Sequence, residues 1–222
     1  MKLDYLEINP KDTANTVVIW LHGLGANADD FMSIVPQLKL PASLAVRFVF
    51  PQAPTLPVTI NNGYEMPAWY DIYHLDRHRD SEQDEVGIRR SELQLAQLLQ
   101  AEINKGIPSE RIILAGFSQG GAIALHTALR CKQKLAGVMV LSSYLPLASF
   151  IAEEKSVENA HLPIFIAHGS NDNVLSIEFA ESTREYLEAH QYPIDWHIYP
   201  MAHQICPEEI RDISAWLQKV LT

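Results

Sequence analysis

Residues 111–121 read RIILAGFSQGG, and this stretch decides the fold. Residues 111–115 are a short apolar run rich in β-branched side chains, which is typical of a buried strand. The pattern that follows predicts a helix over residues 120–131. Between the two lies G-x-S-x-G, in which small residues two positions before and after Ser118 let strand and helix approach while the hydroxyl points outward. The sequence therefore predicts a nucleophilic serine on a sharp strand-to-helix turn.

Similar apolar runs on both sides of this stretch predict an α/β fold, with a mostly parallel central sheet and helices on both faces. The other expected strands are residues 16–21, 46–50, 135–141, 163–167 and 194–199, and residues 2–8 can add an edge strand. The other expected helices are residues 84–105, 177–190 and 207–221. Residues 51–83 read as a long irregular segment, and loops of that length are usually functional.

Composition restricts the classes of protein to consider. The 222 residues contain no Gly/Ser-rich linker and no internal repeat, so we expect one domain over residues 1–222. A formal net charge of −10 repels phosphate backbones and makes nucleic acid an unfavourable partner. Cys131 and Cys206 are too few for a disulfide framework and read as reduced thiols. Because the first residues lack the apolar core of a signal peptide and no later apolar run is long enough to span a bilayer, we expect a cytoplasmic protein without stable membrane insertion.

A serine hydroxyl needs a base, and this fold supplies its partners in the chain order serine, acid, histidine. Strands present such groups at their carboxyl ends. His203 lies just past the predicted strand over 194–199, and Asp172 lies just past the one over 163–167. Asp195 lies at the wrong end of its strand. The sequence therefore predicts a Ser118–Asp172–His203 triad.

Acyl transfer also needs N–H donors aimed at the oxyanion, one after the nucleophile and one in an early strand-to-helix loop. Gln119 supplies the first position. The loop His22-Gly23-Leu24-Gly25 supplies the second, with Leu24 as the expected donor. We interpret His22 and His168, each of which precedes a glycine, as histidines that fix loop geometry.

Two other motifs suggest different chemistry. Residues 23–28 match the dinucleotide fingerprint G-x-G-x-x-A, but the next predicted strand ends in Phe50-Pro51-Gln52, without the acidic residue that binds the ribose. Alternating residues of a second stretch could share one face and bind a metal: Asp71, His74, Asp76, His78 and Asp80. A solvated charged loop is favoured there, because neither metalloprotease spacing nor a cysteine accompanies it. We expect no cofactor and no metal.

The chain resembles the small carboxylesterase and acyl-protein thioesterase family of α/β-hydrolases, in particular its bacterial carboxylesterase branch. The resemblance rests on residues 21–25, 51–54, 57–61, 66–71, 116–121, 141–146, 168–169 with Asp172, and 201–203. It implies hydrolysis of carboxylic esters, often thioesters, through a covalent acyl-enzyme. Ser118, Asp172 and His203 would form the triad, and Leu24 with Gln119 the oxyanion hole, without a cofactor.

The same resemblance implies that residues 54–73 and 143–145 border the acyl site. The candidate substrate-binding residues are Leu56, Met66, Trp69, Tyr70 and Tyr144. The substrate would be a small-molecule or lipid-like acyl ester of short to medium chain length, or an acylated protein, and members are often homodimers. Ala202 stands where glycine is usual, and Val174-Leu175-Ser176 where Val-Val-Pro is usual; both differences bear on loop geometry and rate.

A catalytically inactive binding protein on the same scaffold is the alternative. Such proteins normally lack a triad member, whereas Ser118, Asp172 and His203 are all present. Residues 146–162, which separate two predicted strands, are too few for a separate cap domain. We therefore expect the serine to be reachable without a large lid opening.

Overall fold

The computed structural model describes residues 3–75 and 83–222. Within these ranges, a seven-stranded sheet has the order β1-β3-β2-β6-β7-β8-β9. Its strands are β1 (Tyr5–Ile8), β2 (Thr16–Leu21), β3 (Val46–Pro51), β6 (Ile112–Phe117), β7 (Gly137–Leu141), β8 (Ile164–Gly169) and β9 (Ile194–Tyr199). β1 pairs with β3 in the antiparallel sense and all other neighbours are parallel. The predicted α/β architecture with a mostly parallel sheet is confirmed.

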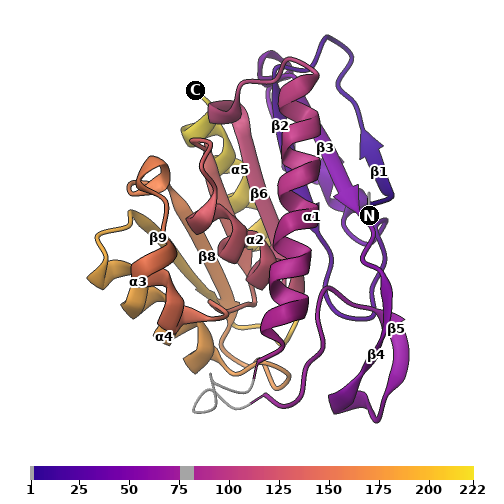
Figure 1. The fold of residues 1–222 in the computed structure, drawn as a ribbon. Coiled ribbons are helices and arrows are strands. Elements are labelled where there is room, and N and C mark those ends of the chain that lie inside the picture. The colour runs from indigo at the N-terminus through magenta and orange to yellow at the C-terminus, as the bar shows by residue number, and fades with distance from the viewer. Residues whose placement is uncertain (1–2, 76–82) are drawn as a thin grey trace.

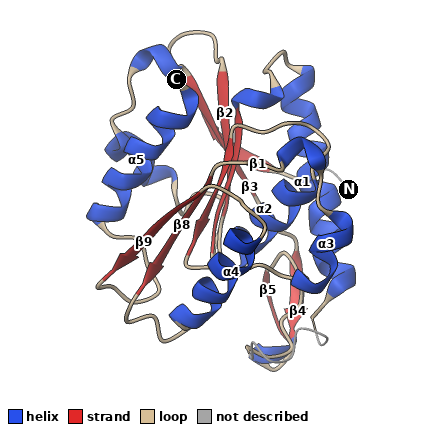
Figure 2. Ribbon diagram, turned by 90° about the vertical axis from the view of Figure 1, so that its left-hand side faces the viewer, coloured by secondary structure: helices blue, strands red, loops and turns tan. Residues whose placement is uncertain are grey.

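Helices cover both faces of this sheet (Figure 2). The helices α1 (Glu85–Asn104), α2 (Gln119–Arg130) and α4 (Ile177–Ala189) pack on one face, and α5 (Pro207–Leu221) and the 3-10 helix η1 (Met32–Leu38) pack on the other. Successive side chains of a strand point to opposite faces. Ile19 of β2 accordingly joins the core under α2, whereas its neighbour Trp20 joins the core under α5.

Local signals explain where the helices begin and end. The Asp84 carboxylate accepts a hydrogen bond from Gly87 N and caps α1, and Gly106 follows that helix with φ +98°. Ile88, Leu95 and Leu99 face the core as predicted. The predicted helices agree with the structure to within one residue at each end. Strand boundaries shift slightly more: β6 begins after Arg111 and extends to Phe117, and β7 begins at Gly137.

The prediction that residues 51–83 are irregular was wrong in part. They contain a two-stranded sheet of β4 (Thr55–Val58) and β5 (Tyr64–Pro67), joined through the 3-10 helix η3 (Thr59–Asn61). Prolines at positions 57 and 67 weaken the sequence signal for a strand. The hairpin projects beyond the carboxyl end of the main sheet (Figure 1).

The crossover between β7 and β8 is short. It holds the 3-10 helices η6 (Ala148–Phe150) and η7 (Val157–Asn159) and one turn of helix, α3 (Ile151–Glu154). No separate cap domain is inserted there, as the sequence predicted. The carboxyl ends of β6, β7 and β8 are therefore not covered by an extra domain from this crossover.

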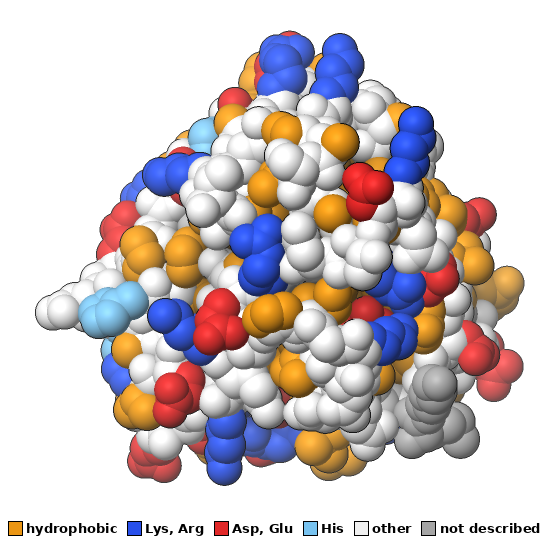
Figure 3. Space-filling view, turned by 90° about the horizontal axis from the view of Figure 1, so that it is seen from above, with side chains coloured by type: hydrophobic (Ala, Val, Ile, Leu, Met, Phe, Trp, Pro, Cys, Tyr) orange, Lys and Arg blue, Asp and Glu red, His pale blue; other side chains and the backbone are white. Residues whose placement is uncertain are grey.

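The opposite end of the molecule, where the parallel strands begin, is seen in Figure 3. Lys and Arg side chains are interspersed with Asp and Glu on this face, and hydrophobic side chains gather only in small groups. In residues 3–75 and 83–222, no helix is both long and apolar enough to cross a membrane.

Candidate active site

Ser118 lies between β6 and α2 with φ 53° and ψ −123°, a backbone conformation that residues other than glycine rarely adopt. Hydrogen bonds hold it there. Its N–H donates to Leu141 O at 2.8 Å, and its carbonyl accepts from Ala122 N at 3.1 Å and from Ser143 Oγ at 2.6 Å. The surrounding structure thus supports the strained backbone and leaves the Ser118 side chain partly exposed.

The glycines of the motif are required by close approach. A Cβ on Gly116 would lie 2.3 Å from the carbonyl group of Gly120. A Cβ on Gly120 would lie 2.5 Å from His22 O and 2.6 Å from Leu21 O. These atoms are backbone and cannot move aside as a flexible side chain can. The strand, the helix and the loop after β2 therefore meet at the serine only because positions 116 and 120 lack side chains.

Asp172 and His203 form a hydrogen-bonded pair at the carboxyl ends of β8 and β9. His203 Nδ1 lies 2.6 Å from Asp172 Oδ2. The other carboxylate oxygen accepts from Val174 N and Leu175 N, each at 2.9 Å. The Asp172 side chain is completely buried, whereas His203 is partly exposed and packs against the Phe117 ring at 4.7 Å between centroids. An ionised carboxylate can accept hydrogen bonds but cannot donate them, so His203 Nδ1 carries the proton of this bond. His203 Nε2 therefore remains available as a base.

Ser118 and His203 line the same pocket, of about 350 Å³. The structure thus brings together the three residues of the predicted triad. Ser118 and His203 share a pocket, and Asp172 is bonded to the Nδ1 atom of His203. Asp195 is instead bonded to His197, with 2.9 Å between Oδ1 and Nε2, and neither residue lines this pocket.

His22 and His168 are buried, and burial lowers the pKa of both imidazoles, so both are neutral near pH 7. His168 Nε2 lies 2.8 Å from the carbonyl of Leu175 and 3.4 Å from the Asp172 carboxylate. His22 Nδ1 lies 2.8 Å from Gly23 O, and its Nε2 accepts from Ala53 N at 3.1 Å. Both therefore connect loop segments around the site, in agreement with our interpretation from the sequence.

The backbone N–H groups of Leu24 and Gln119 are the candidate oxyanion donors. Gln119 is the first residue of α2, where N–H groups have no intrahelical acceptor. Leu24 belongs to the loop after β2, and a Cβ on the neighbouring Gly23 would lie 3.5 Å from Ser118 Cβ. Within the ranges that the structure describes, neither N–H has a hydrogen-bond acceptor. Both residues line the pocket beside Ser118.

Two of the five predicted substrate-binding residues line this pocket. They are Tyr70 and Tyr144, whose hydroxyl oxygens lie 2.8 Å apart. Burial, together with the neighbouring Tyr144, raises the pKa of Tyr70, which keeps its hydroxyl neutral.

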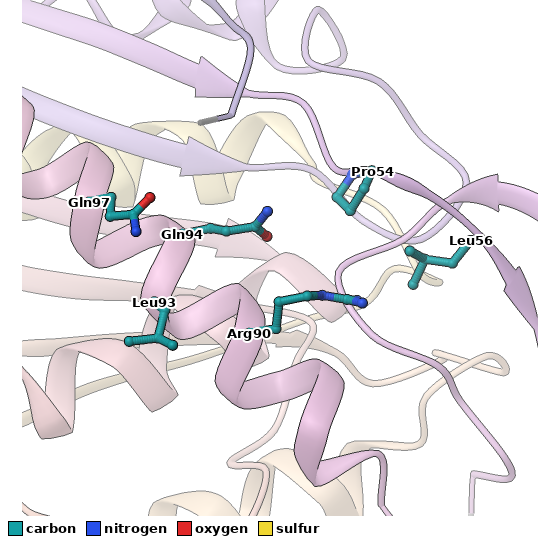
Figure 4. A pocket seen from close by; sticks show the side chains of 6 residues that line it. All are labelled: Pro54, Leu56, Arg90, Leu93, Gln94 and Gln97. Carbon is teal, nitrogen blue, oxygen red and sulfur yellow. The ribbon is translucent and has the colours of Figure 1, made fainter. Parts of the chain in front are cut away.

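The other three predicted residues do not line the pocket. Trp69 is fully buried in the core. Met66 is half-buried, with its sulfur 3.4 Å from the Asn61 amide nitrogen. Leu56 borders a separate hollow of about 350 Å³ between β4 and α1 (Figure 4). We therefore leave these three out of the candidate acyl pocket.

Sequence reasoning missed several apolar residues of the pocket. They are Ile60, Ile72, Leu75, Phe117, Val174 and Leu175. Phe117 is adjacent to the serine, and Val174 and Leu175 follow Asp172 closely, so chain continuity alone could have indicated them. Ile60, in η3, and Ile72, beyond β5, lie within residues 54–73, which the resemblance places at the border of the site, and Ile60 N donates to Ile72 O at 2.8 Å.

In the structure, residues of the two competing motifs form hydrogen bonds within the protein. The Gln52 side chain, at the end of β3, accepts from Ala28 N at 2.9 Å, so an amide stands where the dinucleotide motif would need a carboxylate. Asp71 accepts from the Thr59 N–H and hydroxyl at 2.7 and 2.6 Å and holds η3. In the described part of the chain there is no cluster of three or more potential metal ligands. Asp76, His78 and Asp80 lie outside the described residues, so the preference for a solvated loop remains an expectation.

Comparisons with known proteins identify the family of this chain. The family model described as phospholipase/carboxylesterase matches residues 4–221. The chain is 38% identical to acyl-protein thioesterase 1 of Cryptococcus neoformans, over 99% of this chain and 98% of the relative. Its fold superposes on Arabidopsis thaliana SOBER1 with a TM-score of 0.88 and 30% identity, covering 94% and 100% of the two chains. It also superposes on Zea mays acyl-protein thioesterase 2 with a TM-score of 0.86 and 27% identity, covering 99% of each chain.

These relatives are fungal and plant proteins, and they support the family without selecting its bacterial branch. The family match covers nearly the whole chain. The protein therefore belongs to the phospholipase/carboxylesterase family and is a serine hydrolase of the α/β fold.

Proposed function

We propose that this protein hydrolyses carboxylic esters and thioesters through a covalent acyl-enzyme on Ser118. The observation that carries the proposal is the 2.6 Å His203–Asp172 pair, whose imidazole shares a pocket with Ser118 and with two N–H groups that have no acceptor among the described residues. This combination supplies a nucleophile, a base, a residue that orients the base, and donors for an oxyanion.

In this mechanism Ser118 Oγ attacks the acyl carbon while His203 Nε2 takes the hydroxyl proton. The Asp172 carboxylate stabilises the imidazolium that forms, and the Leu24 and Gln119 N–H groups stabilise the oxyanion. Collapse of the tetrahedral intermediate breaks the bond to the alcohol or thiol, which receives the proton from His203. Water then attacks the acyl-enzyme by the same steps and releases the carboxylic acid and free Ser118.

The pocket favours short to medium acyl chains. A volume of about 350 Å³ and apolar walls at Ile60, Ile72 and Leu75 suit a hydrocarbon chain of limited length. The names of the relatives support an acylated protein as one substrate class, and the family description, phospholipase/carboxylesterase, supports a small or lipid-like acyl ester as the other. Assignment to the bacterial carboxylesterase branch is a finer prediction, and a preference for small esters over acyl-proteins would support it.

The proposal also includes a cytoplasmic location and assembly as a homodimer. The two cysteines are free, which is what a reducing cytoplasm favours. A homodimer is implied by the resemblance, and analytical ultracentrifugation of the purified protein tests it.

We expect the protein to turn over p-nitrophenyl esters and the corresponding acyl-thiol esters. With chain lengths from acetyl to palmitoyl, kcat/KM should rise with added apolar surface until the chain outgrows the pocket, and then fall. The measurement is initial rates for both series, together with mass-spectrometric detection of a fluorophosphonate adduct on Ser118. A folded protein that neither turns over any member nor forms the adduct would instead be the binding protein that is the alternative function.

A further prediction concerns access. Because no cap domain is inserted between β7 and β8, nothing from that crossover needs to be displaced by an oil–water interface. We expect Michaelis kinetics on monomeric ester and no increase in specific activity as the ester passes its solubility limit. Rates are measured across that limit with a detergent-free dispersion. A sharp rise at the onset of aggregation would indicate a segment that closes over Ser118.

A further inference from the structure

The segment over residues 67–70 begins with the last residue of β5. It is bonded to both parts of the chain that carry candidate oxyanion donors, the loop after β2 and the start of α2. Toward the loop after β2, Pro67 O accepts from Gly25 N at 2.8 Å and the Trp69 indole Nε1 donates to His22 O at 2.9 Å. These two contacts flank Leu24 on both sides along the chain. The segment therefore fixes the backbone on either side of one donor.

The Gln119 side chain makes the second connection. Its Oε1 accepts from Trp69 N at 2.8 Å and its Nε2 donates to Tyr70 O at 2.7 Å. Gln119 is only 2% exposed, so these bonds lie out of water, where an unmet polar group is costly. The residue whose N–H is one donor is thus bonded through its own side chain to the segment that holds the other.

Helix α1 supports the segment from its other side. Ser91 Oγ donates to Trp69 O, and the Arg90 guanidinium donates to the same carbonyl at 3.3 Å. The Trp69 ring is fully buried and packs against the His22 ring at 5.4 Å between centroids. The ring of Trp69 therefore contacts the loop after β2, and its peptide groups are bonded to α1 and to Gln119.

We propose that Trp69 and the side chain of Gln119 are positioning residues that set the separation of the Leu24 and Gln119 N–H groups. The inference rests on the proposed function, because it assumes that these donors bind an oxyanion. Such donors must lie about 2.7–3.1 Å from the developing charge, and a displacement of about 1 Å can cost roughly 100-fold in rate. Residues 67–70 connect the loop after β2 with the first residue of α2 through hydrogen bonds outside the backbone of the G-x-S-x-G turn.

The test compares Trp69→Phe, which removes the indole N–H and part of the ring, with Trp20→Phe. Trp20 is a suitable control because it is also buried in the sheet, on the other face, and its Nε1 has no acceptor among the described residues. Trp69→Phe should lower kcat by about 10- to 100-fold with KM within about twofold. Its affinity for an alkyl trifluoromethyl ketone, which forms an oxyanion on the serine, should fall by the same factor. Trp20→Phe should leave all three values within about twofold of wild type.

A loss that Trp69→Phe shares with Trp20→Phe, or one confined to KM, would overturn the proposal, because a general packing defect would then suffice. Gln119→Met, which keeps the backbone N–H but loses both side-chain bonds, serves as a second variant and should show the same split between kcat and KM. Rates are expressed per folded molecule from near-UV circular dichroism. If Ser118→Ala retained full activity, the proposed function would fail, whereas equal loss in both tryptophan variants would reject only the positioning role.

Discussion

Ser118→Ala is expected to lower kcat by about four to six orders of magnitude while leaving the fold unchanged. The substitution removes only the hydroxyl oxygen. The backbone hydrogen bonds to Leu141 and Ala122 that hold the turn remain. Because alanine has nothing to attack with, only the background catalysis from the oxyanion donors and from binding should survive.

The control is Ser142→Ala. Ser142 also has a positive φ, 45°, and its buried hydroxyl has no hydrogen-bond partner in the described part of the chain. It should retain kcat within about threefold, since an unpartnered hydroxyl contributes little. Both variants are measured for p-nitrophenyl ester turnover and for thermal unfolding. Near-normal turnover by Ser118→Ala, with wild-type contamination excluded by mass spectrometry, would point to another nucleophile.

His203→Ala and Asp172→Asn should be strongly non-additive. Asp172→Asn alone should cost about 10⁴-fold in kcat, because the amide at the 2.6 Å contact no longer favours the protonated Nδ1 tautomer. Once His203 is gone, there is no imidazole to orient, so the double variant should be hardly slower than His203→Ala alone. The measurement is a complete double-mutant cycle on kcat with one ester.

The molecule contains a matched control for this cycle in the His197–Asp195 pair, at 2.9 Å. Asp195→Asn should leave kcat within about twofold, since neither residue lines the Ser118 pocket. If the losses for Asp172 and His203 multiplied, or if Asp195→Asn reproduced the loss, the assignment of the acid would be wrong.

The main sheet could be predicted because its strands are short buried runs bounded by loops, and the candidate triad could be predicted because parallel strands end at one edge. Asp172 and His203 needed no information beyond chain order and strand ends. The β4–β5 hairpin escaped prediction because prolines 57 and 67 contradict strand propensity, and its pairing is settled by tertiary contacts.

Trp69 shows a different limit. The resemblance gave Trp69 as a candidate substrate-binding residue, and sequence alone could not show that its indole reaches His22 O. The same holds for the Gln119 side chain, whose partners at Trp69 and Tyr70 are about fifty positions away in the chain. Pairings between residues so far apart in the sequence depend on how the hairpin is placed relative to the main sheet. Short-range sequence patterns carry no information about that placement.

Ser118 has φ 53° and ψ −123°, a conformation that lowers the stability of the folded protein at the position that activity requires. Strain of this kind costs about 1–3 kcal/mol, and glycine is the residue that relieves it. Glycine at this position would give the more stable protein and could not perform the chemistry. Selection for stability alone would therefore remove the nucleophile, and a search for thermostable variants of this enzyme must hold position 118 fixed.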